Sequence, residues 1–265
     1  MKIFVVANQK GGSAKSVFST QFGFHLSEVE KKRVAFIDAD EQASSTYTLR
    51  AFEGGNRAYQ FFGNEPVKVN GDGAEGAMTL FSADKEHLRL VEKMDDQIKL
   101  DANKKAILPQ IATNLRARLD EISDRFDWCV IDTPGANSKV PNAALIAADY
   151  VIVPCTIDSY ALPVANEMLT RIRAVQQHLN PKLKLVGLLP VRFKANDREM
   201  VRHLKELLTF QKDTVLRTKI SDRSAFPYAA DHGMPVWKVD KSAAREAAKE
   251  LREVFDVIGS KVGGF

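Results

Sequence analysis

Cysteine and long apolar runs are what this sequence has least of. Only two of its 265 residues are cysteines, Cys129 and Cys155, and each lies inside a short apolar stretch. Two isolated thiols predict core residues of a reduced, cytoplasmic protein rather than a disulfide framework or a metal site. No apolar run approaches the roughly 18–20 residues that cross a bilayer. The chain begins directly with strand-like residues, and we expect no signal peptide.

The charge of the chain is unevenly distributed. The formal net charge is +4, yet residues 181–245 contain 14 Lys or Arg against 7 Asp or Glu. A local basic excess of this kind is typical of a surface that binds a polyanion. A solvated helical surface explains the same excess equally well, so the composition leaves both interpretations open.

Apolar runs alternate with helical patterns along the chain. The strand candidates are residues 2–7, 33–37, 78–82, 128–131, 150–155, 185–190 and 214–220. The helical candidates are residues 15–29, 84–95, 104–125, 161–178, 196–210 and 241–258. This alternation predicts an α/β fold, with a doubly wound, mostly parallel sheet and helices on both faces. Because no repeat, linker or second core pattern is visible, we expect a single domain over residues 1–265.

Two segments need separate expectations. Residues 50–77 are the least regular part and contain several glycines; we interpret them as a meandering surface connection. The helix at 104–125 is expected to begin at Lys104-Lys105. Its apolar residues recur at spacings of three and four, which predicts a core-facing stripe. The residues of this stripe are Ile107, Ile111, Leu115, Leu119 and Ile122.

The strongest functional signal is at residues 8–17, which read Asn-Gln-Lys-Gly-Gly-Ser-Ala-Lys-Ser-Val. An apolar run precedes them and an amphipathic stretch follows, which predicts a strand, a glycine-rich turn and a helix. In that context backbone N–H groups and the helix N-terminus bind phosphate, a lysine adds charge, and a serine hydroxyl can ligate magnesium. The standard G-x-x-x-x-G-K-[ST] pattern fails, because Gln9 and Ala14 occupy its glycine positions. A second lysine, Lys10, is present instead.

Acidic residues follow two other predicted strands. The run at 33–37 ends in Asp38-Ala39-Asp40-Glu41-Gln42, and the run at 128–131 ends in Asp132-Thr133-Pro134-Gly135. The carboxyl ends of parallel strands meet at one edge of a doubly wound sheet, where ligands bind. Two acidic clusters beside a phosphate loop can hold a hydrated metal ion and position a water molecule. The three strand ends together predict an ATPase site that binds ATP and Mg²⁺.

The stretch Lys10-Gly11-Gly12-x-x-Lys15-Ser16 resembles the deviant Walker A loop of the ParA/MinD family of ATPases. The resemblance covers nearly the whole chain and is closest to short ParA-type partitioning ATPases that lack an N-terminal helix-turn-helix domain. It implies that Lys15 binds the β- and γ-phosphates and that Lys10 reaches across a sandwich dimer to the partner's nucleotide. The residues implied to surround the nucleotide are Gly11, Gly12, Ser13, Ala14, Lys15, Ser16 and Val17.

The same resemblance assigns the remaining roles. Asp40 is expected to orient the attacking water, so that Lys10, Lys15 and Asp40 are the catalytic residues. The expected metal ligands are Ser16, Asp38 and Asp132. Ser221 and Asp222 are expected to close over the adenine. The expected DNA contacts are Arg223, Arg192, Lys194 and Arg198.

A family member of this kind is expected to form an ATP-dependent homodimer that binds duplex DNA without sequence preference. A cargo-bound partner protein would trigger hydrolysis and release, with a plasmid, a chromosome or a protein assembly as the cargo. The protein would be cytoplasmic and nucleoid-associated, with ATP and Mg²⁺ as cofactors. The affinity for DNA would fall steeply with salt.

Two alternatives remain open beside this interpretation. A MinD-like membrane switch would need a basic amphipathic tail, whereas residues 251–265 carry Glu253 and Asp256, and a core-packed terminal helix is favoured. A P-loop metabolic enzyme would need a substrate pocket that the sequence does not identify. The absence of Cys-x-x-Cys argues against an iron–sulfur carrier.

The chain also departs from the family pattern in three places. Ala14 replaces a glycine, Val17 replaces a threonine and Glu41 replaces a proline. A Cβ at position 14 is tolerable only if the backbone stays out of the left-handed region. None of the three departures removes a phosphate or metal ligand.

Overall fold

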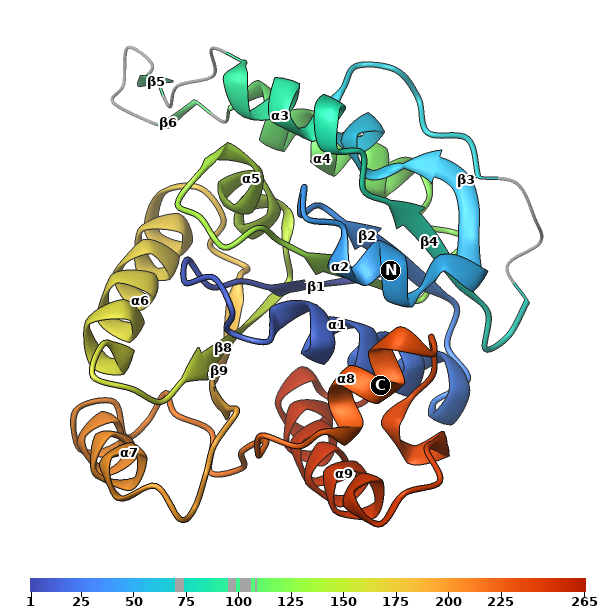
Figure 1. Ribbon diagram of the computed structural model, residues 1–265. Coiled ribbons are helices and arrows are strands. Elements are labelled where there is room, and N and C mark those ends of the chain that lie inside the picture. The colour runs from blue at the N-terminus through green and yellow to red at the C-terminus, as the bar shows by residue number, and fades with distance from the viewer. Residues whose placement is uncertain (70–73, 95–98, 101–105, 108) are drawn as a thin grey trace.

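A seven-stranded sheet forms the centre of the molecule (Figure 1). In this computed structural model, the described residues are 1–69, 74–94, 99–100, 106–107 and 109–265. The strand order is β3-β4-β2-β7-β1-β8-β9, and every pairing within the described sheet is parallel. The strands are β1 (Lys2–Val6), β2 (Val34–Asp38), β3 (Glu53–Arg57), β4 (Met78–Ser82), β7 (Trp128–Asp132), β8 (Tyr150–Thr156) and β9 (Lys184–Val191). The prediction of a doubly wound, mostly parallel sheet is confirmed.

Helices cover both faces of this sheet. Side chains alternate along the strands, so Phe4 and Val6 pack on one face and Val5 and Ala7 on the other. One layer contains α1 (Lys15–Phe24), α8 (Ala225–Asp231) and α9 (Ser242–Val262). The other layer contains α3 (Lys85–Lys93), α4 (Gln110–Glu121), α5 (Lys139–Ala147), α6 (Ala161–His178) and α7 (Arg198–Phe210). Figure 1 shows the two layers on opposite sides of the strands.

Strand register brings the predicted functional ends together. Val6, the last residue of β1, pairs with Asp132 at the end of β7, and Asp38 at the end of β2 pairs with the same Asp132. The three strands therefore end at the same level on neighbouring positions of the sheet. The loop after β2 leads into a short helix, α2 (Ser44–Thr48). This arrangement places the loop after β1 beside both acidic clusters, as the sequence predicted.

Some predicted elements differ in the structure. No strand covers 214–220 among the described residues; this segment meets β9 and the loop after it through two isolated bridges, Leu188 to Val215 and Phe193 to Ser221. The helix expected at 104–125 begins at Gln110. Ala106–Ile107 forms strand β6, which pairs with β5 (Lys99–Leu100), and the expected start at Lys104-Lys105 lies outside the described residues.

Strand β3 lies inside the segment expected to be irregular. Its sequence, Glu-Gly-Gly-Asn-Arg, has no apolar alternation, because it is an edge strand whose side chains face solvent or one partner strand. Gly54 is required there, since a Cβ would come within 2.4 Å of the Thr79 side chain. Of the predicted stripe in α4, Ile111, Leu115 and Leu119 are buried in the core.

The C-terminal helix packs on the sheet. Its apolar stripe, including Leu251, Phe255 and Ile258, is buried against α1 and the strands. The helix continues through Gly259 and ends at Val262, where Gly263 adopts a left-handed conformation. Core packing of this tail is confirmed, and its apolar face is covered by protein. None of the helices described is long and apolar enough to cross a membrane.

A buried histidine joins α1 to this terminal helix. Residues His25–Val29 extend α1 as a single π-helical turn. The His25 ring stacks on Phe255 at a centroid distance of 4.4 Å and meets Phe265 at 5.4 Å. Burial in this aromatic cluster lowers the pKa of His25 from 6.5 to about 4, although Asp256 opposes the shift. The neutral ring is the form that the folded protein accommodates.

This shift predicts a loss of stability in mild acid. Above pH 7 the imidazole is neutral in both folded and unfolded chains, so it contributes nothing. As the pH falls below 6.5, His25 becomes protonated in the unfolded chain, whereas in the folded protein it stays neutral until about pH 4. The free energy of unfolding should therefore fall by about 2 kcal/mol between pH 7.5 and 5 from this group alone. In the His25→Phe variant, the fall in the free energy of unfolding between these pH values should be smaller than in the parent by about the same amount.

Urea unfolding at the two pH values measures the effect. His232→Gln, which replaces an exposed histidine on the same side of the sheet, is the matched control and should lose as much as the parent. An equal acid loss in His25→Phe and the parent would show that His25 is not the group responsible.

Candidate functional site

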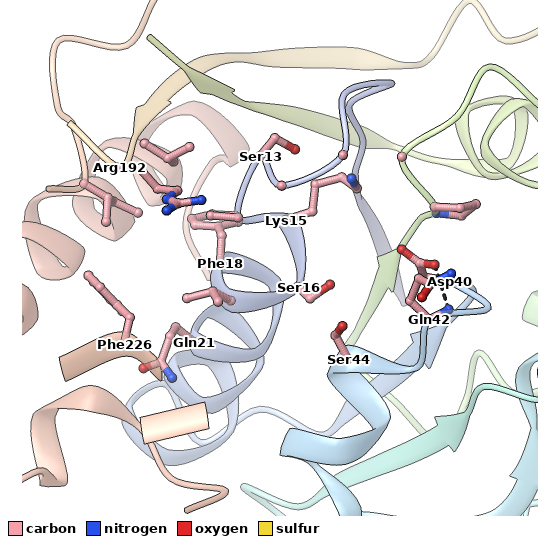
Figure 2. Close-up of a pocket in the computed structure, with 18 of the residues that line it drawn as sticks. Ser13, Lys15, Ser16, Phe18, Gln21, Asp40, Gln42, Ser44, Arg192 and Phe226 are labelled. Carbon is pink, nitrogen blue, oxygen red and sulfur yellow. Dashed lines mark hydrogen bonds between the residues drawn. The ribbon is translucent and has the colours of Figure 1, made fainter. Parts of the chain in front are cut away.

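A cavity of about 860 Å³ opens at the carboxyl edge of the sheet, over the N-terminus of α1. Figure 2 shows Lys15 and Ser16 at its centre, with Asp40 and Gln42 on one side and Arg192 and Phe226 on the other. The predicted site residues that line it are Gly11, Gly12, Ser13, Ala14, Lys15, Ser16, Val17, Asp40, Arg192, Ser221, Asp222 and Arg223. The apolar end contains Phe18, Ile220, Phe226 and Leu251. The loop after β1 and the N-terminus of α1 thus adjoin an apolar end of the same cavity.

Asn8 anchors the glycine-rich loop and was not predicted. Its side-chain amide donates to the Pro154 carbonyl at 2.6 Å, and its Oδ1 accepts from the Lys10 N–H at 3.0 Å. Because Asn8 is buried, these bonds fix the start of the loop against β8. The only sequence signal is its position directly after the first strand.

The loop ends in a strained residue. Gly12 has φ of 72°, as a glycine turn allows, but Ala14 has φ of 55° and ψ of 24° immediately before α1. The condition under which a Cβ at position 14 is tolerable, a backbone outside the left-handed region, is therefore not met. The turn into the helix requires that conformation whichever side chain is present. A Cβ there costs roughly 1–2 kcal/mol.

Lys15 projects from the first turn of α1 into the cavity, where the loops after β1 and β7 lie close to it. Its side chain is buried, and burial lowers its pKa while Asp132 and Asp40 oppose the shift. A Cβ on Gly135 would lie 3.1 Å from the Lys15 Nζ and 3.2 Å from the Gly11 backbone. Because residue 135 has no Cβ, the loop after β7 can lie directly against the loop after β1. The result is a buried cation at a helix N-terminus, which favours an anionic ligand.

Two fully buried carboxylates lie beside this lysine. Asp132 accepts from the hydroxyls of Ser19 at 3.1 Å and Ser45 at 2.8 Å. Asp38 accepts from the backbone N–H of Thr46 at 2.7 Å and from its hydroxyl at 2.8 Å. Burial and the neighbouring Asp132 raise the pKa of Asp38 to about 8, and burial raises the pKa of Asp132 as well. A cation bound between the two carboxyl groups would favour their ionised forms.

The donor set suits a magnesium ion. Carboxylate and hydroxyl oxygens are the ligands that Mg²⁺ prefers, and it usually keeps several waters and takes others from substrate phosphates. No group of three His, Cys, Asp or Glu side chains in the described ranges could hold a metal alone. Ser16 and Asp132 therefore fit a metal that is shared with a bound phosphate, rather than a site made by protein alone.

Asp40 lies on the loop after β2, at the rim of the cavity. Its backbone N–H donates to Asp38 Oδ1 at 3.2 Å, and its own Oδ1 accepts from the Gln42 N–H at 3.0 Å. These two bonds hold the loop in a tight turn. Asp40 lines the cavity, and Figure 2 shows its side chain beside Gln42, on the opposite side of Lys15 from Arg192. The carboxylate is therefore placed to accept a hydrogen bond from a molecule inside the cavity.

Lys10 does not line the cavity. Its ammonium group pairs with the Asp158 carboxylate, and the Tyr160 ring centroid lies 5.7 Å away. Thr133, which directly follows Asp132, donates its hydroxyl to the Val6 carbonyl at 2.9 Å and so connects the end of β7 to β1.

The basic residues expected to contact DNA separate into two groups. Arg192 and Lys194 lie 3.6 and 3.3 Å from the carboxylate of Asp222, and Arg198 is exposed at the start of α7. Arg223 instead pairs with Glu250 of α9 at 2.8 Å, and both Arg223 and Arg192 line the cavity.

Glu250 also accepts from the backbone and the hydroxyl of Ser221, both at 2.8 Å. It therefore holds the segment that was expected to close over the adenine. Nothing in the spacing of the sequence identified Glu250, because it is a single acidic residue on an amphipathic helix.

The strain at Ala14 generates a prediction. Ala14→Gly should raise the free energy of unfolding by about 0.5–1 kcal/mol, because removing the Cβ relieves the left-handed backbone while glycine adds entropy to the unfolded chain. Denaturant titration of the ligand-free protein measures the change. Lys31→Gly is the matched control, since Lys31 has the same φ of 55° outside the cavity and should gain a similar amount. A loss of stability in Ala14→Gly alone would mean that packing of the Ala14 methyl outweighs its strain.

Comparison with known proteins places this site in a family. The AAA domain family model matches residues 1–185, more than half of the chain. Protein IncC of Escherichia coli is 33% identical over 267 residues, which cover 99% of this chain and 70% of IncC. The chromosome-partitioning ATPase Soj of Treponema pallidum is 25% identical over 268 residues, with 96% of each protein covered.

The solved structure of McdA(D38A) from Cyanothece in complex with ATP has a similar fold. Its TM-score is 0.77 at 19% identity, and the match covers 98% of this chain and 96% of McdA. At that identity the likeness supports the fold, whereas the family model and the IncC match establish kinship. The chain therefore belongs to the ParA-type partition ATPases, with IncC and Soj, and is an ATP-binding ATPase of that family.

Proposed function

We propose that this partition ATPase binds ATP with its phosphates against residues 11–17 and its adenine at the apolar end of the cavity. The observation that carries the proposal is the buried Lys15, held at the N-terminus of α1 beneath Gly135. Its burial is costly unless an anion compensates the charge. The Lys15 ammonium then contacts the β- and γ-phosphates, and the loop N–H groups surround them. Ser221 and Asp222, positioned through Glu250, close over the base.

Ser16, Asp38 and Asp132 are the residues that would hold Mg²⁺. When bound, the ion neutralises phosphate charge and stabilises the charge that develops on the leaving oxygen. Ser16 would ligate the ion directly, while the two buried carboxylates would act on its water shell. Burial raises the pKa of both carboxyl groups, so metal binding is expected to release protons.

Asp40 orients the attacking water for hydrolysis. The water oxygen forms a bond to the γ-phosphorus as the β–γ bridging bond breaks, and ADP and inorganic phosphate leave. Asp40 accepts a hydrogen bond from that water, since its loop holds the carboxylate at the rim of the cavity. Lys15 stabilises the phosphate charge from the protein's own side.

Dimerisation couples this chemistry to cargo movement. In the proposed ATP-bound homodimer, Lys10 exchanges Asp158 for the nucleotide of the other subunit and adds a second cation to the transition state. Exposed Arg192, Lys194 and Arg198 then contact duplex DNA through its phosphates, which keeps the dimer on the nucleoid. A cargo-bound partner protein accelerates hydrolysis and so releases the dimer. Arg223 contacts DNA only by leaving Glu250, so its contribution is expected to be the smallest.

Two substitutions separate binding from hydrolysis. Lys15→Ala should weaken ATP binding by at least about 100-fold, because it removes a charge-assisted interaction with the phosphates. Asp40→Ala should bind ATP within a few-fold of the parent, slow hydrolysis by about 100-fold or more and accumulate the ATP dimer. Nucleotide titration, single-turnover hydrolysis and sedimentation in ATP-Mg measure the three quantities. Hydrolysis by Asp40→Ala at the parent rate would reject its role with the water.

DNA binding is tested by fluorescence anisotropy of a random-sequence duplex in ATP-Mg and in ADP-Mg at two salt concentrations. Binding should require ATP, and Arg192→Ala or Lys194→Ala should each reduce the salt slope by about one, because each variant neutralises one DNA phosphate fewer. Lys249→Ala, an exposed lysine of α9, is the control and should match the parent. Equal or absent binding in both nucleotide states would reject the DNA step. Liposome binding or acceleration by a small molecule would then favour the membrane or metabolic alternatives.

A further inference from the structure

Helix α3 is attached to both loops that carry the acidic residues of the site. At its middle, the Arg89 Nε donates to Glu41 Oε2 at 2.7 Å, with a second contact from the guanidinium to Oε1 at 3.5 Å. Glu41 directly follows Asp40 in the chain. A two-point contact of this kind fixes the direction of the loop after β2 as well as its distance from α3.

Near its end, the same helix caps α5. The two carboxylate oxygens of Glu92 accept from the backbone N–H groups of Lys139 and Val140, both at 2.9 Å. The Lys139 ammonium returns to the Met94 carbonyl at the end of α3. The first turn of α5 is where the loop that begins at Asp132 ends, so α3 also fixes the far side of that loop.

The start of α3 is connected to the buried carboxylate as well. The Ala83 N–H donates to the Thr46 hydroxyl at 2.8 Å, and that hydroxyl donates to Asp38. Arg89 and Glu92 are three residues apart and therefore lie on one face of the helix. Glu41, Leu88, Glu92, Ser138 and Val140 line the end of the cavity between α3 and α5.

Stability is not what the Arg89–Glu41 pair supplies. The Arg89 side chain is 53% exposed and that of Glu41 is 33% exposed, and solvent-exposed pairs of this kind contribute little to stability. What distinguishes the pair is its place, one residue from Asp40.

We propose that α3 braces the two acidic loops against each other, with Arg89 and Glu92 as positioning residues for hydrolysis. Arg89 acts through Glu41 on the direction of the Asp40 carboxylate, and Glu92 acts through α5 on the loop after Asp132. The inference rests on the proposed role of Asp40. Because α3 contacts neither the residues 11–17 nor the apolar end through these bonds, removing them changes the rate of hydrolysis rather than nucleotide affinity.

The test is a charge exchange across the pair. Arg89→Met should lower the single-turnover rate by about tenfold, since small misplacements of a water-orienting group are costly. Its nucleotide Kd should stay within about twofold of the parent, because every group that binds the phosphates is still present. Arg89→Glu combined with Glu41→Arg should recover most of the rate, whereas either reversal alone should not. Glu92→Ala should lower the rate in the same way and with the same unchanged Kd.

Arg202→Met is the control, because Arg202 forms an exposed pair with Glu199 on α7 at the same distance of 2.7 Å, away from the acidic loops. It should match the parent in rate, Kd and Tm. Parent-like rates in Arg89→Met and Glu92→Ala, or no recovery in the charge exchange, would overturn the brace. Asp40→Ala measured beside them keeps the two proposals distinct. A slow Asp40→Ala with fast α3 variants rejects only the brace, whereas a fast Asp40→Ala rejects the role of Asp40 itself.

Discussion

The rest of the site depends on burying charge at the ends of three adjacent strands. Asp38 and Asp132 are fully buried on neighbouring strands, and Lys15 is buried beside them. In a low-dielectric interior, two carboxylates on adjacent strands oppose each other's ionisation, and the lysine offsets one of them. The folded protein therefore holds an arrangement that a cation and a polyphosphate complete. Ligand binding relieves a cost that is already present in the ligand-free fold.

Short polar side chains make that arrangement possible. Ser19 and Ser45 satisfy Asp132, Thr46 satisfies Asp38, and Asn8 holds the loop after β1. Each comes from a segment that the sheet brings to the same edge, so most of the pairs are far apart in the sequence. Buried polar groups of this kind must find partners. Their hydrogen bonds determine where the loops lie, while the apolar strands determine that the loops meet at all.

The sequence predicted the parts of the fold that depend on burial from both faces. Apolar runs such as residues 128–131 identified the central strands, and the residues after them identified the acidic ends. The edge strand β3 was missed because edge residues need no apolar pattern, and the strand predicted at 214–220 was wrong because an apolar run does not reveal whether a ladder forms. The left-handed backbone at Ala14 could not be predicted from the sequence, because a backbone conformation is set by the turn as a whole. Glu250 was missed because a single polar contact between distant segments produces no recognisable pattern in the sequence.

The position of Lys10 connects the ligand-free fold to its proposed partner. Lys10 resembles the family's cross-dimer lysine, yet here it pairs with Asp158 beside Tyr160 at the surface. A partly exposed ion pair contributes little stability, so exchanging it for a polyphosphate in a second subunit is favourable. The pair therefore keeps the lysine ordered near the rim without preventing its transfer. In the proposed homodimer, ATP would supply the stronger counter-ion. Assembly of two subunits would then follow from competition between a carboxylate within the chain and a triphosphate across the interface.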